Sequence, residues 1–147
     1  MSSPNFLRPS ASEKIFNRIF GALVGLGLGF SYNYLLQVRG RKTGRLYSTP
    51  VNVLDYEGKR FLVAPRGRTQ WVRNAEVSGE VILRKRGTRQ LCKLRVVTGD
   101  EKLPILKTYL DRYRKAVQRY FPIPAGSPVE QFAPLAENYP AFELLPL

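Results

Sequence analysis

Histidine is absent from this 147-residue sequence, and its absence excludes much of the chemistry that enzymes perform with their own side chains. Without histidine there can be no Ser-His-Asp triad and no Cys-His pair, and the commonest ligand of zinc and iron is missing. We therefore expect no metal site. Any reaction must depend on a cofactor, on tyrosine or carboxylate groups, or on backbone amides.

Cysteine is almost absent too, because the sequence contains Cys92 alone. A single cysteine excludes an internal disulfide and fits a reducing compartment, so we expect a cytoplasmic protein. Cys92 lies in a predicted strand, and we interpret it as a small buried apolar residue without a redox role.

Acidic residues are scarce: 11 aspartates and glutamates stand against 24 lysines and arginines, which gives a net charge of +13. This balance favours an anionic partner, such as a phosphorylated cofactor, a nucleic acid or an acidic lipid surface. The length and composition are those of one globular domain, and no internal repeat is present. We expect residues 1–147 to form a single domain.

The N-terminal part is predicted to stand apart from the sheet. Residues 1–9 are expected to be a loose lead-in, and residues 10–30 to form an amphipathic helix. Residues 19–36 carry no charge, but glycines and a polar turn interrupt them, so we do not interpret this stretch as a transmembrane helix. Packing on the body of the protein is the simplest interpretation. Contact with a membrane surface through Ile15–Phe30, or a role in roofing an apolar pocket, stays open.

Apolar periodicity in the rest of the chain predicts six strands and three helices. Alternating runs bounded by turn residues give strands at residues 32–39, 46–56, 60–65, 81–85, 89–97 and 139–145. A short helix follows Thr69, which can cap it, a long helix spans residues 100–120, and a third spans 127–136. Arg112 and Arg119 are expected on the solvent face of the long helix. Together these elements predict an α+β protein with a barrel-like, mostly antiparallel sheet.

Two basic loops are the most distinctive local feature. The first is Gly40–Gly44 with its flanking arginines, and the second is Arg66-Gly67-Arg68. Glycines allow tight turns whose amide hydrogens face outward, and the side chains add positive charge. A basic hairpin turn alone is commonly a solvated feature. The hairpin between the loops can bring both to one end of the sheet, and together they favour an anionic ligand.

Aromatic residues next to these loops have a simpler interpretation. Trp71, the single tryptophan, could stack on a flat ligand, but a lone tryptophan at the start of a short amphipathic helix is usually part of the core. Tyr109, Tyr113 and Tyr120 are expected to pack along one face of the long helix.

Several of these elements, taken in order, resemble the deazaflavin-dependent nitroreductase and quinone reductase family. The elements are Gly40-Arg-Lys-Thr-Gly44, Thr49-Pro50, Val63-Ala64-x-Arg-Gly67, Trp71-x-x-Asn74 and Tyr139-Pro140. The resemblance covers about residues 32–98 and the last strand. It implies that residues 31–147 form a split β-barrel of about six mostly antiparallel strands with flanking helices. It also implies binding of the reduced deazaflavin coenzyme F420 and hydride transfer to a quinone-like or nitroaromatic acceptor.

The same resemblance implies which residues contact the coenzyme. Its phosphate and oligoglutamate tail would be held by the first basic loop, at Arg41, Lys42, Thr43, Gly44 and Arg45. The deazaflavin ring would lie beside the loop that follows the hairpin, at Ala64, Pro65, Arg66 and Gly67. The remaining pocket residues would be Thr49, Pro50, Trp71 and Asn74.

Two positions depart from the family pattern, and the proton donor is not determined. Tyr47 stands where many members have an arginine, and Pro65 stands where a serine is often found near the ring. The proton that accompanies the hydride would come from Tyr32, Tyr34, Tyr47 or water. The acceptor is expected to be small and apolar or aromatic. Family members are often dimers, so a homodimer is allowed.

Two alternatives use the same positive charge differently. A split barrel can bind FMN, whose phosphate the same arginines could hold. The protein could also be a non-enzymatic basic module that binds nucleic acid or an anionic membrane. Nucleic acid is not expected, because the arginines cluster at two loops and are not interleaved with exposed aromatic residues along one face.

Overall fold

The computed structural model describes Arg18 and residues 31–147 of the chain. The predicted lead-in at residues 1–9 and the predicted helix at 10–30, apart from Arg18, lie outside the described residues. The same holds for the proposed membrane contact through Ile15–Phe30. Among the described residues, no helix is both long and apolar enough to cross a membrane.

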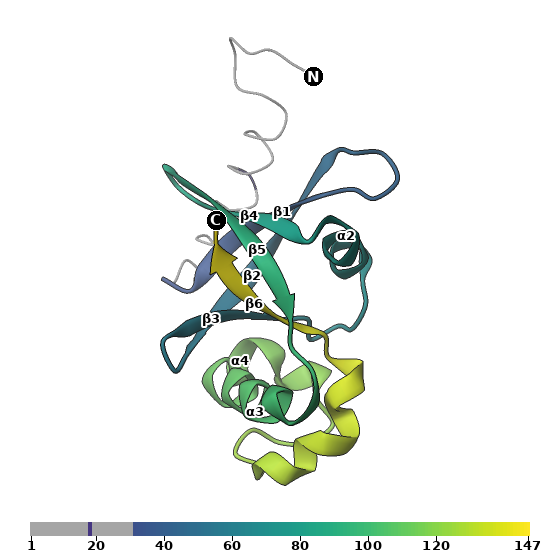
Figure 1. Cartoon of the computed structure of the whole chain (residues 1–147). Helices are drawn as coiled ribbons and strands as arrows, with labels where there is room; N and C mark the ends of the chain where they lie inside the picture. Colours follow the sequence, from purple (N-terminus) through teal and green to yellow (C-terminus); the bar gives the residue numbers. More distant parts are fainter. Residues whose placement is uncertain (1–17, 19–30) are drawn as a thin grey trace.

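Six antiparallel strands form a closed barrel in the order β1-β2-β3-β6-β5-β4 (Figure 1). Their bounds are β1 Asn33–Arg39, β2 Leu46–Tyr56, β3 Lys59–Val63, β4 Glu80–Lys85, β5 Thr88–Val96 and β6 Ala141–Pro146. The barrel closes where β1 pairs with β4. The predicted α+β barrel with flanking helices is confirmed.

The alternation of side chains along the strands produces two apolar cores. Leu62 and Cys92 belong to a buried cluster on the inner face of the barrel. The neighbouring Phe61 points the other way, into a second buried cluster that includes Leu106 and Phe132 of the helical part. Successive residues of a strand face opposite sides of the sheet, so one hairpin supports both cores. Cys92 is fully buried, which confirms its interpretation as a small buried residue, and this burial raises the pKa of its thiol.

Helix α2, Gln70–Ser78, lies beside the barrel, away from the other helices (Figure 1). Its N-cap is Thr69, as predicted, but the threonine side chain makes no capping hydrogen bond. At the other end, Gly79 adopts the left-handed conformation that commonly ends helices, and its amide donates to the Ala75 carbonyl at 2.8 Å. Val72 and Ala75 bury one face of the helix against the barrel.

The predicted long helix at residues 100–120 is wrong as a single element. The chain forms a short 3-10 turn η1 (Gly99–Glu101), helix α3 (Lys102–Arg112), helix α4 (Arg114–Val117) and a second 3-10 turn η2 (Gln118–Tyr120). The interruption falls at Tyr113, whose hydroxyl donates to the Val53 carbonyl at 2.9 Å. The Tyr113 ring also lies 4.6 Å from that of Tyr32. These contacts hold Tyr113 against the barrel while the backbone leaves helical geometry.

The third predicted helix, 127–136, is a 3-10 helix, η3 (Val129–Asn138), that contains Pro134. The loop before η3 is attached to α3 by a small polar network. Lys107 Nζ lies 2.9 Å from Asp111 Oδ2 and donates to the Ser127 carbonyl at 2.9 Å. The Gly126 amide donates to Asp111 Oδ1 at 2.7 Å. Burial alone would raise the pKa of Asp111, but the Gly126 amide and Lys107 outweigh it, so that the pKa is lowered.

We expect Asp111→Asn to reduce stability at neutral pH and to have no effect in acid. A carboxylate with a lowered folded-state pKa stabilises the protein above its unfolded pKa of about 3.9. That contribution is lost as the pH falls through the folded value. The substitution should therefore cost up to about 1 kcal/mol at pH 7, since the pair is partly exposed. Urea unfolding at several pH values measures this, with the exposed Glu130→Gln as control. A cost that persists at about pH 2 would contradict an electrostatic origin.

Candidate functional site

Two adjoining cavities open on the described part of the protein. The larger has a volume of about 1140 Å³ and lies between the barrel and the α3–α4 region. The smaller has a volume of about 540 Å³ and lies between the β1–β2 loop and α2. Four residues line both: Thr49, Arg66, Thr69 and Trp71. The two cavities therefore form one extended groove, with the β1–β2 loop at one end and α4 at the other.

The β1–β2 loop keeps its shape through short backbone hydrogen bonds. The Gly40 amide donates to the Arg45 carbonyl at 2.6 Å, and the Gly44 amide donates to the Gly40 carbonyl at 2.9 Å. Gly44 has a φ of 76°, in the left-handed region that favours glycine. Arg39 Nη1 donates to the Gly44 carbonyl at 2.6 Å. The loop is thus a defined turn, as predicted.

Asn74 attaches this loop to α2. Its side-chain oxygen Oδ1 accepts hydrogen bonds from the Arg41 amide at 3.0 Å and from Arg41 Nη1 at 2.8 Å. Arg41 Nη1 also donates to Gln70 Oε1 at 3.0 Å. Asn74 is buried, so these bonds satisfy a polar group that would otherwise be costly to bury. The predicted coenzyme contacts Arg41 and Asn74 therefore lie together in the smaller cavity and bind each other.

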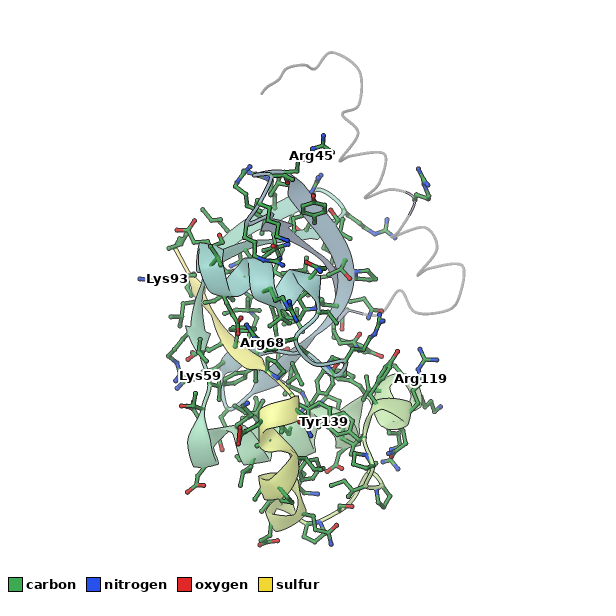
Figure 2. The ribbon with its side chains drawn as sticks, turned by 90° about the vertical axis from the view of Figure 1, so that its right-hand side faces the viewer. Arg45, Lys59, Arg68, Lys93, Arg119 and Tyr139 are labelled. Atoms are coloured by element: carbon green, nitrogen blue, oxygen red, sulfur yellow. The ribbon has the colours of Figure 1, made fainter. Side chains whose placement is uncertain are left out.

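The cations of the two basic loops differ in their availability. Lys42 and Arg66 are exposed and line the smaller cavity, and no hydrogen-bonded or ion-paired partner is found for either among the described residues. Arg68 instead pairs with Glu76 at 2.6 Å and lies outside both cavities. Figure 2 shows Arg45 at one end of the described part of the chain, on the β1–β2 loop, and it lines neither cavity. Lys42 and Arg66 are thus the cations most available to a ligand.

The remaining predicted contacts divide between the two cavities. The larger is lined by Thr49, Pro50, Ala64, Pro65, Arg66, Gly67 and Trp71, and the smaller is also lined by Lys42 and Thr43. Gly44 lines neither. The segment after β3 turns at Gly67, which has a φ of 83° and donates its amide to the Ala64 carbonyl at 3.1 Å. The two basic loops come together as predicted, because residues of the first loop and Arg66 of the second line the same smaller cavity.

Trp71 is half-buried, and it lies where the two cavities meet. One side of its ring packs on Phe142 of β6, with centroids 6.0 Å apart. Its interpretation as a core residue is therefore half correct, because the ring joins the core and also borders the groove. An indole in this position can contact a flat ligand.

The three candidate proton donors occupy different surroundings. Tyr32 lines the larger cavity, where its ring packs against Tyr113. Tyr47 lines the smaller cavity, and its hydroxyl lies 3.2 Å from Thr43 Oγ1. Tyr34 lines neither cavity, and Lys85 Nζ lies 4.7 Å from the centroid of its ring. Among the three, Tyr32 alone borders the larger cavity.

Gly40→Ala is expected to displace the Tyr47 ring. A Cβ at residue 40 would lie 2.5 Å from Tyr47 Cε2 and 3.1 Å from Thr43 Oγ1. Tyr47 is 47% exposed and can turn aside, so we expect a loss of about 1 kcal/mol in unfolding free energy, at the low end for overpacking. Urea unfolding of Gly40→Ala in the wild-type and Tyr47→Ala backgrounds measures the coupling. An equal cost in both backgrounds would show that the Tyr47 ring is not responsible, which leaves the contact with Thr43 or the backbone as the cause.

The polar floor of the larger cavity was not predicted from the sequence. Asn33 Nδ2 donates to Asn52 Oδ1 at 2.7 Å, and both residues line the cavity with Tyr109. Burial raises the pKa of Tyr109, and a hydrogen bond with Asn52 offsets part of this effect. Its hydroxyl is therefore neutral at physiological pH. Asparagines in a strand pattern carry no signal that would single them out as site residues.

Arg112 and Arg119 are exposed, as expected, and they also border the larger cavity together with Arg114 and Lys115. The apolar periodicity identified the buried face of this region correctly. It could not show that the opposite face borders a cavity, because the break at Tyr113 and the approach of the barrel depend on tertiary packing.

These features define a groove suited to an elongated anion with a flat ring. The smaller cavity offers lysine, arginine and a hydroxyl-bearing loop, and the larger offers tyrosine and tryptophan rings beside a backbone turn. No group of histidine, cysteine or acidic side chains that could hold a metal ion is found in the part of the chain that the structure describes.

The sequence profile of the F420H(2)-dependent quinone reductase family matches residues 12–123. The chain belongs to this family, and the resemblance seen in its motifs is confirmed. No protein of curated function shows significant similarity to it.

Solved structures support the same fold. The F420-H2 dependent reductase FDR-A superposes with a TM-score of 0.52 at 17% identity, over 78% of this chain and 94% of that one. Atu2129 from Agrobacterium tumefaciens, of unknown function, gives 0.57 at 21% identity over 79% of this chain. This chain spans only 48% of Atu2129. HutZ, the heme storage protein from Vibrio cholerae, gives 0.55 at 12% identity, over 96% and 92% of the two chains. At these identities the likeness concerns the fold, which is the predicted split β-barrel.

Proposed function

We propose that this protein binds reduced F420 along the groove and directs hydride transfer to a quinone-like or nitroaromatic acceptor. The observation that carries the proposal is the junction of the two cavities at Thr49, Arg66 and Trp71. A cationic cavity there opens into an aromatic one, which matches a coenzyme with an acidic tail and a flat ring. The family to which the chain belongs uses the same coenzyme.

The residues of the smaller cavity would bind the acidic part of the coenzyme. Lys42 and Arg66 have available charge, and Arg41 is oriented by Asn74. Hydrogen bonds between charged groups and phosphate or carboxylate are about twice as strong as neutral ones. Thr43, with its hydroxyl in the same cavity, supplies a further donor. Arg45 can reach only a tail that extends beyond the cavity.

The residues of the larger cavity would orient the ring and exclude water from one of its faces. The turn at Ala64–Gly67 brings backbone close to the groove, and Trp71 borders it with an indole. When bound, the coenzyme supplies the hydride. Reduction of a quinone to a quinol also needs a proton, and Tyr32 or water in the larger cavity would deliver it.

Coenzyme binding and turnover test this proposal separately. Titration of the purified protein with oxidised F420 should change the coenzyme fluorescence in a saturable way at micromolar concentration. Reduced F420 and menadione should then yield oxidised F420 only when the protein is present. Absence of coenzyme binding at micromolar concentration would refute the proposal.

The two alternatives predict different observations. FMN would use the same arginines for its phosphate, and a yellow preparation with flavin absorbance would favour it. A basic module for nucleic acid or anionic membranes would be retained on DNA or anionic vesicles at moderate salt. Retention that disappears as salt is raised would reflect net charge alone.

A further inference from the structure

A second cationic cluster lines the far end of the larger cavity, and coenzyme binding as proposed above does not use it. We call it the helical cluster: Arg112, Arg114, Lys115 and Arg119. Among the described residues that line this cavity, Asp111 is the single acid, and its carboxylate is already bound to Lys107 and to the Gly126 amide. The positive charge of the helical cluster is therefore largely uncompensated.

Two members of the helical cluster are held in place by the protein. Arg112 Nη1 donates to the Asp55 carbonyl of β2 at 2.6 Å. The Arg119 guanidinium lies 4.9 Å from the centroid of the Tyr120 ring, and both residues border the cavity. The side chains of Arg114 and Lys115 make no hydrogen bond to any other described residue, and both residues are exposed. Two cations are thus positioned, and two are free to close on a ligand.

The helical cluster and the basic loop lie at opposite ends of the groove. Figure 2 shows Arg45, on the β1–β2 loop, well separated from Arg119 of η2. The aromatic residues Trp71, Tyr32 and Tyr113 line the cavity between the two regions. If the acidic tail of the coenzyme binds the β1–β2 loop, the helical cluster is left to contact the acceptor on the other side of the deazaflavin ring.

We propose that the acceptor of this protein is itself an anion: a flat, electron-poor ring that carries a carboxylate, sulfonate or phosphate, held by the helical cluster. This proposal rests on the proposed function and names its substrate class. An aromatic lining next to a cluster of cations suits an amphiphilic anion better than a neutral quinone, because a neutral ring gains nothing from the charge. The bound reduced coenzyme would be oxidised by loss of its hydride, and the acceptor would take up this hydride and a proton. A quinone would become a quinol with both hydrogens on its oxygens, and the anionic group would be unchanged.

Two naphthoquinones that differ at one substituent test the proposal. Menadione carries a methyl group where 1,4-naphthoquinone-2-sulfonate carries a sulfonate. Binding to the protein without coenzyme can be followed by quenching of Trp71, which is the single tryptophan of the chain and lines the cavity. Wild-type protein should bind the sulfonate roughly three- to tenfold more tightly than menadione, the range expected for a few exposed ion pairs. A binding measurement avoids the difference in redox potential between the two quinones.

The double variant Arg114→Ala/Lys115→Ala tests the site. The double variant Arg89→Ala/Lys93→Ala is its control, and each double variant is called a pair below. Arg89 and Lys93 are exposed on β5 and line neither cavity, so the control removes the same charge elsewhere. We expect the first pair to abolish the preference for the sulfonate and the control to retain it. Both pairs are exposed, and matching melting temperatures would verify folding.

Three results would overturn the proposal. Equal loss of preference in both pairs would show an effect of net charge. Preferential binding of menadione by wild-type protein would exclude an anionic acceptor. Weaker binding of F420 by Arg114→Ala/Lys115→Ala, with the quinone preference unchanged, would assign the helical cluster to the coenzyme tail. A failure of the proposed function would give a different result from a failure of this proposal. In that case the protein would prefer the sulfonate but would not bind F420.

Discussion

Replacing Arg41 and Lys42 together with alanine is expected to weaken F420 binding at least roughly tenfold, because each charge-assisted contact contributes about 1.5–3 kcal/mol. Both residues line the smaller cavity, and Lys42 has no partner of its own among the described residues. Fluorescence titration of the coenzyme at fixed ionic strength measures the change. The double variant Arg89→Ala/Lys93→Ala serves as control, since Arg89 and Lys93 are exposed and line neither cavity. If both double variants weaken F420 binding equally, the β1–β2 loop acts only as part of a general positive surface.

The single variants separate charge from loop geometry. Arg41 also donates to Asn74 and Gln70, so Arg41→Ala should lower the unfolding free energy by about 1 kcal/mol in addition to its effect on binding. Lys42→Ala removes a charge without a structural contact and should leave stability unchanged within about 0.5 kcal/mol. Asn74→Ala keeps both cations but removes the acceptor that holds Arg41. If Asn74→Ala weakens coenzyme binding and Lys42→Ala does not, the loop acts mainly through its shape.

Phe142→Ala is expected to be among the most destabilising substitutions near the site, at about 3–5 kcal/mol. Phe142 is 1% exposed on β6, and its ring packs against that of Trp71 with centroids 6.0 Å apart. Its removal would leave a cavity and also allow Trp71 to move. Because a domain of this size has a total stability of about 5–15 kcal/mol, the variant should stay folded but unfold at much lower urea concentration.

Val77→Ala is the matched control for Phe142→Ala. Val77 is 68% exposed on α2, so its truncation should change stability by no more than about 0.5 kcal/mol. A cost for Phe142→Ala similar to that for Val77→Ala would contradict the position of Phe142 in the core. Loss of coenzyme binding in folded Phe142→Ala would further show that Trp71 needs this support.

Much of the barrel could be predicted from sequence because its strands are local patterns. β2 has the predicted bounds, Leu46–Tyr56, since turn residues flank it on both sides. The hairpins were predicted to within a residue or two, as is usual for element ends. The sequence could not predict that α3 ends at Arg112, because apolar periodicity reports which face is buried and continues through the break at Tyr113.

The basic loop could likewise be predicted, and the larger cavity only in part. Glycine and cation patterns identify Arg41, Lys42 and Arg66, because the formation of a turn depends on residues that are adjacent in the sequence. The floor residue Asn52 and the cation Arg119 come from β2 and from the turn after α4, which meet only through tertiary packing. The hydrogen bond from Arg41 to Asn74 could not be predicted for the same reason. It joins the β1–β2 loop to helix α2, which begins only after two further strands.

The position of β6 has a consequence for how the protein folds. β6 pairs with β3 on one side and with β5 on the other, and residues 64–140 separate Val63 from its partner Ala141. Until β6 is synthesised and inserted, the facing edges of β3 and β5 stay unpaired and can pair with other chains. Such a late, long-range step slows folding, because the entropy of closing a long loop is lost before the new contacts compensate for it. Chaperone supply and expression temperature should therefore govern the soluble yield of this protein more than its final stability does.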